Sequence, residues 1–521
     1  MARGMAWKTI ASRMARLLAC EPARAWGVVE EALRSEKGAA AFGVLLRASQ
    51  LAAQYGEADL AREGVERHCA SLGARRRVDR REHAACRAIQ LAIDLASKSY
   101  ERAAATARVL DWSALPGEGW AFNLRLLLLT RENDHGAVLD LLRKPPALID
   151  PYERGNRLRI LGKYFLLRGR WDRVAGYFHA AFREYARDGA IDARLKEVEI
   201  LGVLGSAASQ EGRWAEAESL LDRAVRESAR LKHPFYEPSF RIELAQLHAD
   251  RGEMELAESM LRVVCAKLRR RKRPSDADRF LLVAALLVAG SAAADHDRPA
   301  DVERLLAEAR ELLAAGNHPR LRAYWHLLRG RLLALSTDES ARGSAGEEFD
   351  AAERSFRKIG DGDLLGLSRV ALHRGHLHLK RRELVPALER ALECMEFAKA
   401  GRLLSIQARC LLLESQLLLQ REVPRAERLY EQVLTNLGSI HDPVVLFKVI
   451  ANLYLHSWEL GDQVDLTDYH LRQIHKMAEV LDRDTFHDLY ARHVSGPVAR
   501  RVLARSFGVT TPPTGEHPGF L

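Results

Sequence analysis

Residues 161–182 read LGKYFLLRGRWDRVAGYFHAAF, and two later stretches repeat their pattern in register. Residues 204–224 read LGSAASQEGRWAEAESLLDRA, and residues 244–264 read LAQLHADRGEMELAESMLRVV. In each stretch a small residue is followed by glycine seven positions later and by a large residue two positions after that. Apolar or small residues then continue at helical spacing. This recurrence predicts pairs of antiparallel helices stacked as a solenoid.

Each part of the pattern has a physical reason. A small residue in the first helix lets the second helix approach closely, and we expect it to face the small residue that opens that helix. The glycine of the turn can take the left-handed conformation that ends a helix without a steric penalty. These turn glycines are Gly169, Gly212 and Gly252. The large residue that follows fills the groove between the two helices, and each pair leaves an apolar face for the next pair to cover.

The pattern resembles the tetratricopeptide repeat (TPR). This resemblance implies an all-α fold, a right-handed superhelical α-solenoid of about ten TPR-like helix–turn–helix repeats. The stretch from Phe356 through Glu393 resembles the longer repeats of MalT-like bacterial regulators, and the resemblance covers about residues 40–460. It is carried by Phe356, Ile359, Gly360, Asp361, Gly375, Glu383, Leu384 and Ala387. Unlike those regulators, the chain has no GxxxxGK[ST] phosphate loop and no room for an ATPase before residue 40.

The chain divides by pattern into three parts. Residues 1–460 are predicted to form the solenoid, with the clearest repeats in 150–435. Residues 461–507 read as a helical C-terminal cap. Residues 508–521 contain three prolines and two further glycines after Gly508, and are predicted to be a flexible tail. Within the solenoid, the polar stretch Ser336–Gly346 is predicted to be an inserted loop.

The composition favours a soluble helical protein. The 80 basic and 70 acidic residues give a net charge of +10, which permits contact with nucleic acid or anionic membranes without requiring it. The richest apolar run, Phe280–Gly290, is too short to span a bilayer, so we expect no membrane span. Residues Met1–Cys20 fit a first solenoid helix better than an organelle transit peptide. The six cysteines form no CxxC pair, and we interpret them as unpaired core residues of a cytoplasmic protein.

Two groups of residues have side chains that can bind metal. His373 and His376 share a helix face while His378 points elsewhere, so partly exposed helix histidines explain the group better than a metal site. His68, Cys69, His83 and Cys86 are zinc-type ligands, but residues 68 and 69 face different directions on a helix. Ordinary packing is therefore the preferred interpretation. No metal or cofactor is expected.

Basic runs are the second kind of candidate. The run Lys267–Arg273 contains Lys267, Arg269, Arg270, Arg271, Lys272 and Arg273. It either ends a helix as a solvated cap or contacts an anionic partner. Arg75–Arg77 form a second basic run, and the basic amphipathic stretch Val498–Arg505 leaves a DNA-reading helix as an alternative to a cap.

The surface that we expect to bind a partner is the concave groove lined by the first helices of successive repeats. The repeat offsets place these residues there: Asn156, Arg159, Lys163, Tyr324, Arg331, Arg369, His376 and Lys380. A basic groove suits acidic or C-terminal peptide segments. The carboxylate clamp of chaperone-binding TPR domains is not expected, because Val203 and Glu243 stand where clamp residues would be needed.

The sequence therefore predicts a protein that binds without catalysing a reaction. We find no phosphate loop, HExxH or GxSxG motif. A protein-binding scaffold or adaptor in a bacterial signalling or regulatory complex is the preferred hypothesis. The alternative is a nucleic-acid-associated regulator that binds through the basic runs. The identity of the partner and the oligomeric state are open.

Overall fold

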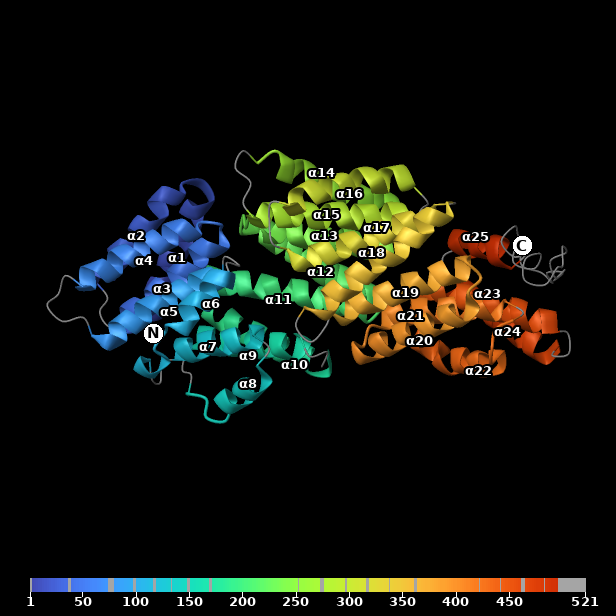
Figure 1. The fold of residues 1–521 in the computed structure, drawn as a ribbon. Helices are drawn as coiled ribbons and strands as arrows, with labels where there is room; N and C mark the ends of the chain where they lie inside the picture. The colour runs from blue at the N-terminus through green and yellow to red at the C-terminus, as the bar shows by residue number, and fades with distance from the viewer. Residues whose placement is uncertain are drawn as a thin grey trace. The chain divides into compact units, whose positions relative to one another are not determined.

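The computed structural model describes most of the chain, and every regular element in its described part is helical (Figure 1). The described residues are 2–35, 39–73, 79–96, 100–115, 119–132, 134–147, 150–167, 171–251, 253–271, 276–295, 298–314, 318–336, 338–359, 363–420, 422–440, 442–460, 464–481 and 483–494. The predicted tail 508–521, the runs Arg75–Arg77 and Val498–Arg505, and the residues Gly169, Gly252, Lys272 and Arg273 lie outside them. The chain forms two compact units, which we describe separately.

Unit 1 consists of Met1–Ala207, Ala215–Ala292 and Ala314–Gly316. Its helices are α1 (Ala2–Cys20), α2 (Pro22–Ser35), α3 (Ala39–Gln54), α4 (Ala58–Gly73), α5 (Arg80–Ala96), α6 (Tyr100–Arg108), the 3₁₀-helix η1 (Trp112–Ala114), α7 (Gly119–Arg131), α8 (His135–Leu142), α9 (Pro151–Leu167), α10 (Trp171–Asp188), α11 (Ile191–Gln210), α12 (Trp214–Arg230), α13 (Tyr236–Asp250), α14 (Met254–Arg269) and α15 (Asp276–Asp295). The last residues of α11 and α15 belong to unit 2.

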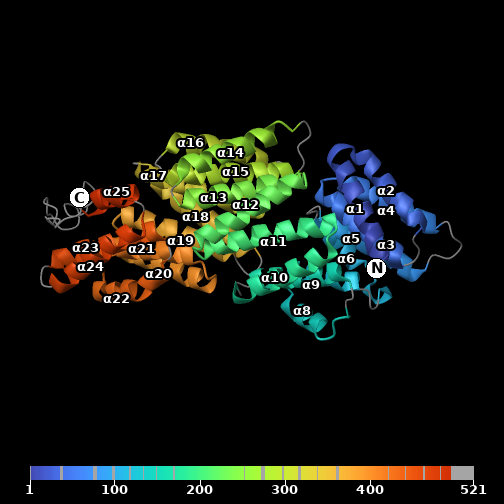
Figure 2. The same ribbon diagram turned by 180° about the vertical axis from the view of Figure 1, so that it is seen from behind.

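Unit 2 consists of Ala208–Trp214, Ala293–Leu313 and Asn317–Leu521. Its helices are α16 (Pro299–Ala314), α17 (Pro319–Leu335), α18 (Glu339–Arg357), α19 (Leu364–Lys380), α20 (Leu384–Ala400), α21 (Leu404–Leu418), α22 (Ala426–Asn436), η2 (Leu437–Ser439), α23 (Pro443–Leu460), α24 (Val464–Lys476), η3 (Met477–Glu479) and α25 (Arg483–His493). The same order can be followed from behind in Figure 2.

The helices pack as pairs that stack on one another. Within pairs, α9 packs against α10, α17 against α18 and α19 against α20. Between pairs, first helices also meet: α3 packs against α5, α7 against α9, and α19 against α21. The chain is therefore an all-α helical-repeat solenoid, as the sequence predicts.

The small residues of the pattern lie where helices approach most closely. A Cβ atom at Gly162 would lie 3.1 Å from Cζ of Phe178, and one at Gly205 would lie 2.8 Å from Cγ of Leu221. At Gly205 the Cβ atom would also lie 3.3 Å from the backbone oxygen of Ala217, so this glycine meets the small residue near the start of the second helix as expected. At Gly162 the expectation is wrong, because the ring of Phe178 fills the space. At the turn, Gly212 has φ +71°, the left-handed conformation that the pattern predicts.

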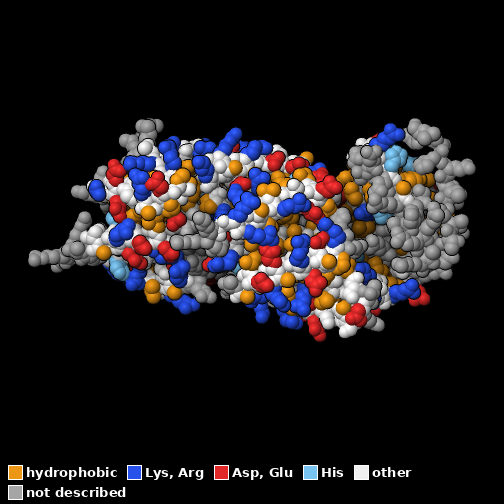
Figure 3. Space-filling view, turned by 90° about the horizontal axis from the view of Figure 1, so that it is seen from above, with side chains coloured by type: hydrophobic (Ala, Val, Ile, Leu, Met, Phe, Trp, Pro, Cys, Tyr) orange, Lys and Arg blue, Asp and Glu red, His pale blue; other side chains and the backbone are white. Residues whose placement is uncertain are grey.

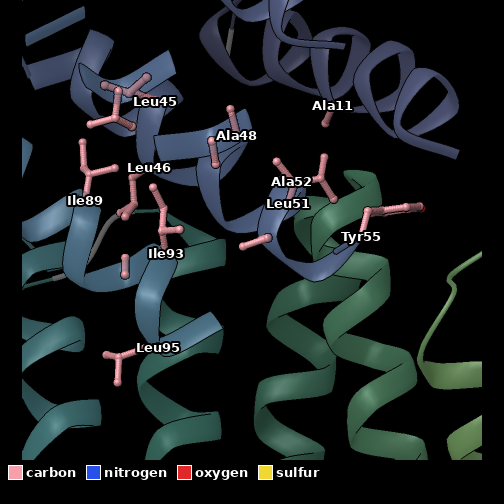
Figure 4. Packing of buried hydrophobic residues seen from close by; sticks show 14 of the residues in the cluster. Ala11, Leu45, Leu46, Ala48, Leu51, Ala52, Tyr55, Ile89, Ile93 and Leu95 are labelled. Carbon is pink, nitrogen blue, oxygen red and sulfur yellow. The ribbon is translucent and has the colours of Figure 1, made fainter. Parts of the chain in front are cut away.

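The core of unit 1 extends across helices that are far apart in sequence. Its buried residues include Leu45 and Leu51 from α3 and Ile89 and Ile93 from α5, which are labelled in Figure 4. The same cluster includes Ala190, Leu195 and Leu201 at and within α11 and Phe240 of α13. The hydroxyl of Tyr55, just after α3, donates a hydrogen bond of 2.9 Å to the carbonyl of Leu231. The N-terminal helices thus pack against α11–α13.

Two expectations from the sequence are wrong. Four of the six cysteines are paired: Cys69 with Cys86 between α4 and α5, and Cys394 with Cys410 between α20 and α21. Neighbouring helices bring their Cα atoms to 6.4 Å in both cases, within reach of a disulfide. The stretch Ser336–Gly346 is not a loop, because α18 begins at Glu339. The carboxylate of Asp338 caps this helix by accepting a hydrogen bond of 3.1 Å from the backbone N–H of Ser340.

One helix among the described residues, α15, is long and apolar enough to cross a membrane by length and composition. Of its most apolar window, 61% is buried inside the protein. A core helix passes the same test, so this helix gives no reason to assign a membrane span.

Candidate functional site

A cavity of about 350 Å³ lies inside unit 1, and we refer to it as the unit 1 cavity. Six odd-numbered helices line it: α3, α5, α7, α9, α11 and α13. Its polar lining residues are Gln50, Gln54, Asn123, Glu153, Asn156, Arg159, Lys163, Lys196, Glu199, Ser206, Ser239 and Glu243. Its aromatic lining residues are Trp120, Phe235, Tyr236 and Phe240. The first helices of successive pairs therefore share one inner surface.

Three of the predicted groove residues lie in this cavity. Asn156, Arg159 and Lys163 are three and four positions apart on α9, which puts them on one helix face. Val203 and Glu243, which the sequence placed at groove positions unsuited to a carboxylate clamp, also line the cavity. That these residues bind a partner stays a prediction.

The carboxylate of Glu199 is the centre of a charge network in the cavity. Its oxygens accept hydrogen bonds of 3.1 and 3.3 Å from Nη1 of Arg159, and its Oε1 also contacts Nζ of Lys163. Nζ of Lys196 lies 3.6 Å from Oε2, and the hydroxyl of Tyr236 donates to the same oxygen at 3.4 Å. Three cations thus surround one anion.

Burial and neighbouring charges shift the pKa values of this network. Burial alone would raise the pKa of Glu199, but the charges of Arg159, Lys163 and Lys196 hold it well below its usual range. Burial lowers the pKa of Lys196 to about 8, and the positive charge of Arg159 adds to this effect while Glu199 opposes it. The network therefore keeps Glu199 ionised and leaves Lys196 close to titration at neutral pH.

A second group of polar residues lies nearby in the lining. The side-chain amide of Asn123 donates hydrogen bonds of 2.7 Å to Oε2 of Glu153 and 2.9 Å to its carbonyl. Burial raises the pKa of Glu153 to about 7, although the hydrogen bond from Asn123 opposes the shift. Within the described part of the chain, Oε1 of Gln54 is buried without a hydrogen-bond partner. It is an acceptor at the cavity wall that a bound group can use.

The repeat length would have identified two cavity residues, Lys196 and Glu199, that the repeat pattern alone did not indicate. Arg159 and Glu199 are 40 positions apart, and the same step carries Asn156 to Lys196 and Lys163 to Val203. Gln54, Asn123 and Trp120 lie in the weaker N-terminal repeats, where the pattern gave no groove positions. They had no comparable signal in the sequence.

The other five predicted groove residues lie in unit 2, on α17 and α19. The guanidinium of Arg331 donates a hydrogen bond of 2.5 Å to Oδ1 of Asp295. Nζ of Lys380 donates to the carbonyl of Ala334 at 3.4 Å. The guanidinium carbon of Arg369 lies 5.9 Å from the ring centre of Tyr324. Burial lowers the pKa of His376 to about 4, and the charges of Lys380 and Arg331 add to this shift.

The histidines and cysteines that the sequence analysis considered as metal ligands do not form a metal site. Among the described residues, no group of three or more His, Cys, Asp or Glu side chains is placed to hold a metal ion. Cys69 and Cys86 are joined to each other, so their sulfurs are not free thiolates. Nδ1 of His378 contacts Oε2 of Glu383 at 2.5 Å.

The basic run at the end of α14 is partly neutralised by the chain itself. Lys267 forms an ion pair with Glu237. Arg271 forms an ion pair with Asp278, and its Nη2 donates a hydrogen bond of 2.9 Å to the carbonyl of Pro234. Arg269 and Arg270 are exposed. Figure 3 shows Lys and Arg side chains interspersed with Asp and Glu among the described residues of one face. The structure thus favours the solvated helix end for part of this run.

Comparison with known proteins adds little to this description. No protein-family model and no curated protein matches the chain. Among solved structures, the chain is similar to the pentatricopeptide repeat protein PPR10 from maize, with 13% sequence identity. The match covers 97% of this chain and 89% of that chain, with a TM-score of 0.23. The helices and their packing define the chain as an all-α helical-repeat protein.

Proposed function

We propose that the chain is a non-catalytic binding scaffold of tetratricopeptide type, and that the unit 1 cavity holds a short peptide segment of a partner protein. One observation carries this proposal: the first helices of six successive pairs line one cavity of about 350 Å³. This volume is in the range of pockets that enclose ligands. The preformed helices lose little conformational entropy on binding.

The polar lining suits the main chain of a peptide. Gln50, Gln54, Asn123 and Asn156 carry amide groups that can pair with backbone N–H and C=O groups. The buried Oε1 of Gln54 gains a donor if a backbone N–H reaches it. Trp120 and Phe235 offer aromatic surface to an apolar side chain of the same segment.

The cations of the cavity can bind a carboxylate of the segment. Glu199 stays ionised and is a weak base, so it holds these cations in place rather than taking up a proton. Lys163 and Lys196 lie beside the carboxylate of Glu199, and the lining also holds the cation Arg159 and the carboxyl groups of Glu153 and Glu243. A carboxylate of the bound segment can share these cations through charge-assisted hydrogen bonds.

We place this function in a bacterial signalling or regulatory complex, on the strength of the resemblance to MalT-like arrays. Nucleic-acid binding through the run Lys267–Arg273 is the alternative. The ion pairs of Lys267 and Arg271 weigh against it, because charges already paired within the chain release fewer counterions from a phosphate backbone.

The test is a peptide selection followed by measured affinities. Peptides displayed from a random library are selected on the full chain, and the enriched ones are titrated by fluorescence anisotropy. Val203→Trp places an indole inside the cavity and is expected to reduce affinity at least tenfold. Val263→Trp adds the same group on α14, where Val263 is 58% exposed, and is the matched control.

The proposal fails if Val203→Trp, shown to be folded by circular dichroism, binds the selected peptides as tightly as wild type. It also fails if the chain enriches no peptide but binds generic RNA or DNA with an affinity that falls steeply with salt. Equal losses in both tryptophan variants would show a nonspecific effect and would also count against the cavity.

A further inference from the structure

The first helices of unit 2 bring several basic side chains to one place. Arg369, His373, His376 and Lys380 are spaced by four, three and four positions, and therefore lie along one face of α19. α19 packs against α17, which carries Arg331, and against α21, which carries Arg409. Arg331, Arg369, Lys380 and Arg409 are the cations of this group, and His373 and His376 are neutral imidazoles among them because burial lowers both of their pKa values. We call these six residues the unit 2 cation cluster.

A contact between α19 and α17 and the pKa shifts of the cluster indicate that its members lie near one another. Lys380 reaches the end of α17 by donating to the carbonyl of Ala334 at 3.4 Å. Burial lowers the pKa of His373 well below its usual range, and the electrostatic effects of Arg331, His376, Arg409 and Arg369 add to the shift. Burial also lowers the pKa of Arg331; Asp295 opposes this shift, and Arg409 and Arg369 add to it. The cluster is therefore one electrostatic site spread over three helices.

The site is half enclosed, so its charges are poorly screened by water. The side chain of Arg331 is 12% exposed, whereas that of its partner Asp295 is 49% exposed. Arg369, Arg409, His373 and His376 are half-buried, and Lys380 is at the rim. Gathering the charges of Arg331, Arg369, Lys380 and Arg409 in such a place is unfavourable unless anionic groups lie nearby, and a bound anion would add to the one that Asp295 supplies.

We propose that the unit 2 cation cluster binds the dianionic phosphate group of a phosphate monoester. The donors come from three helices, and a tetrahedral phosphate offers three oxygens in three directions where a carboxylate offers two in one plane. Its charge of about −2 also matches several cations better than the single charge of a carboxylate. Guanidinium groups present paired N–H donors that fit phosphate oxygens. This inference is independent of the peptide proposed for unit 1.

The phosphate monoester has two possible sources, a phosphorylated protein segment or a free phosphorylated metabolite. Isothermal titration calorimetry on the full chain distinguishes them with three probes: inorganic phosphate, 5′-AMP and the capped peptide acetyl-Ala-phosphoserine-Ala-amide. The unphosphorylated peptide and its glutamate counterpart are the controls for charge. We expect at least about tenfold tighter binding of a phosphate monoester than of the glutamate peptide. The tighter of the two monoesters identifies the source.

Variants locate the binding in the cluster. Arg369→Gln and Arg409→Gln are each expected to weaken monoester binding at least about tenfold. Arg369→Lys keeps the charge but loses the planar pair of donors, and is expected to have an intermediate affinity. Arg354→Gln removes the same charge from an exposed position on α18 and is expected to bind as wild type does.

Several results would overturn the proposal. One is a wild-type chain that gives no binding heat with any phosphate monoester, or that binds the glutamate peptide equally well. A second is an equal loss in Arg354→Gln and Arg369→Gln, which would reflect net charge alone. A third is tight binding of single-stranded DNA without a terminal phosphate, lost in Arg369→Gln, because this would make the cluster a nucleic-acid surface.

Discussion

Two glutamates on inner helices of this protein, Glu199 and Glu414, differ because their neighbours differ. Glu199 lies among Arg159, Lys163 and Lys196, and these cations hold its pKa well below the usual range despite burial. Glu414 on α21 is fully buried, and its oxygens accept hydrogen bonds of 3.3 Å from the amide of Gln432. Burial raises the pKa of Glu414 to about 7, although Lys399 and Gln432 oppose the shift. The surroundings of Glu199 therefore favour its ionised form, whereas those of Glu414 favour its neutral form.

Glu414→Gln is expected to stabilise the protein at pH 8 more than at pH 5. The folded pKa of about 7 exceeds the unfolded value of 4.5, so this group stabilises the fold fully below pH 4.5, and that contribution is lost as pH rises through 7. Glutamine has the same shape and does not ionise. We expect a gain of about 2 kcal/mol at pH 8 relative to pH 5. Urea unfolding at both pH values measures it.

The control for this prediction is Glu431→Gln, an exposed change in the neighbouring helix α22. It is expected to leave the pH dependence as in wild type. A Glu414→Gln variant whose stability differs from wild type by the same amount at both pH values would show that Glu414 titrates normally.

At the level of single residues, the sequence predicted part of the candidate site. Periodicity identified Asn156, Arg159 and Lys163 because they belong to a repeat with a clear pattern. It did not show that Arg159 and Lys163 bind Glu199 of the next pair, because a solenoid pattern gives the face of a residue and not its partner. The aromatic and amide residues of α3 and α7 were missed because their repeats have diverged from the pattern.

At the level of helices, glycine has two different roles that the sequence does not separate. Gly330 of α17 lies against Phe349 of α18, and a Cβ atom there would be 2.6 Å from Cε1 of that ring. Gly346 lies within α18, where a Cβ atom would meet nothing within 4 Å. The glycines and serines of Ser336–Gly346 indicated a loop, yet glycine in an exposed helix costs only about 1 kcal/mol. Packing of Phe349 and Phe356, both fully buried, is sufficient to outweigh it.

The two glycines are therefore expected to respond in opposite directions to the same substitution. Gly330→Ala forces the Phe349 ring to move and is expected to destabilise the protein by about 1–3 kcal/mol. Gly346→Ala adds a good helix former in open space and is expected to stabilise it by about 0.5–1 kcal/mol. Thermal unfolding followed by circular dichroism measures both. A destabilising Gly346→Ala would contradict a helix at this position.

At the level of the whole molecule, unit 1 departs from simple stacking. A solenoid repeat is expected to contact only its neighbours. In unit 1, however, Nε and Nη2 of Arg47 on α3 donate hydrogen bonds of 2.7 and 2.9 Å to Asp192 of α11, 145 positions away. Nη2 of Arg47 also donates a hydrogen bond of 3.1 Å to Oδ1 of Asp188 of α10. Periodicity predicted the helix pairs but carries no information on such distant contacts, or on the division into two units.

Arg47 joins the start of unit 1 to its middle through a planar, charged group. Its guanidinium carbon lies 3.7 Å from the ring centre of Tyr152 and 5.0 Å from that of Trp7. Nε1 of Trp7 donates a further hydrogen bond of 3.2 Å to Asp192. The side chain of Arg47 is 12% exposed and that of Asp192 is 3% exposed, so water cannot replace these contacts. The unit 1 cavity lies between helices that this residue ties together, namely α3 and α11.

Arg47→Lys is therefore expected to destabilise unit 1 although the charge is kept. An ammonium cannot donate to both aspartates in one plane or stack on Tyr152, so we expect a loss of about 2–3 kcal/mol. Amide hydrogen exchange is expected to accelerate in α3 and α11 and not in the helices of unit 2. Arg67→Lys, at an exposed pair with Glu30, is the matched control and is expected to change stability by less than about 0.5 kcal/mol. If Arg47→Lys matched this control in both measurements, the contacts between α3 and α11 would not hold unit 1 closed, and its helices would be stabilised by neighbour stacking alone.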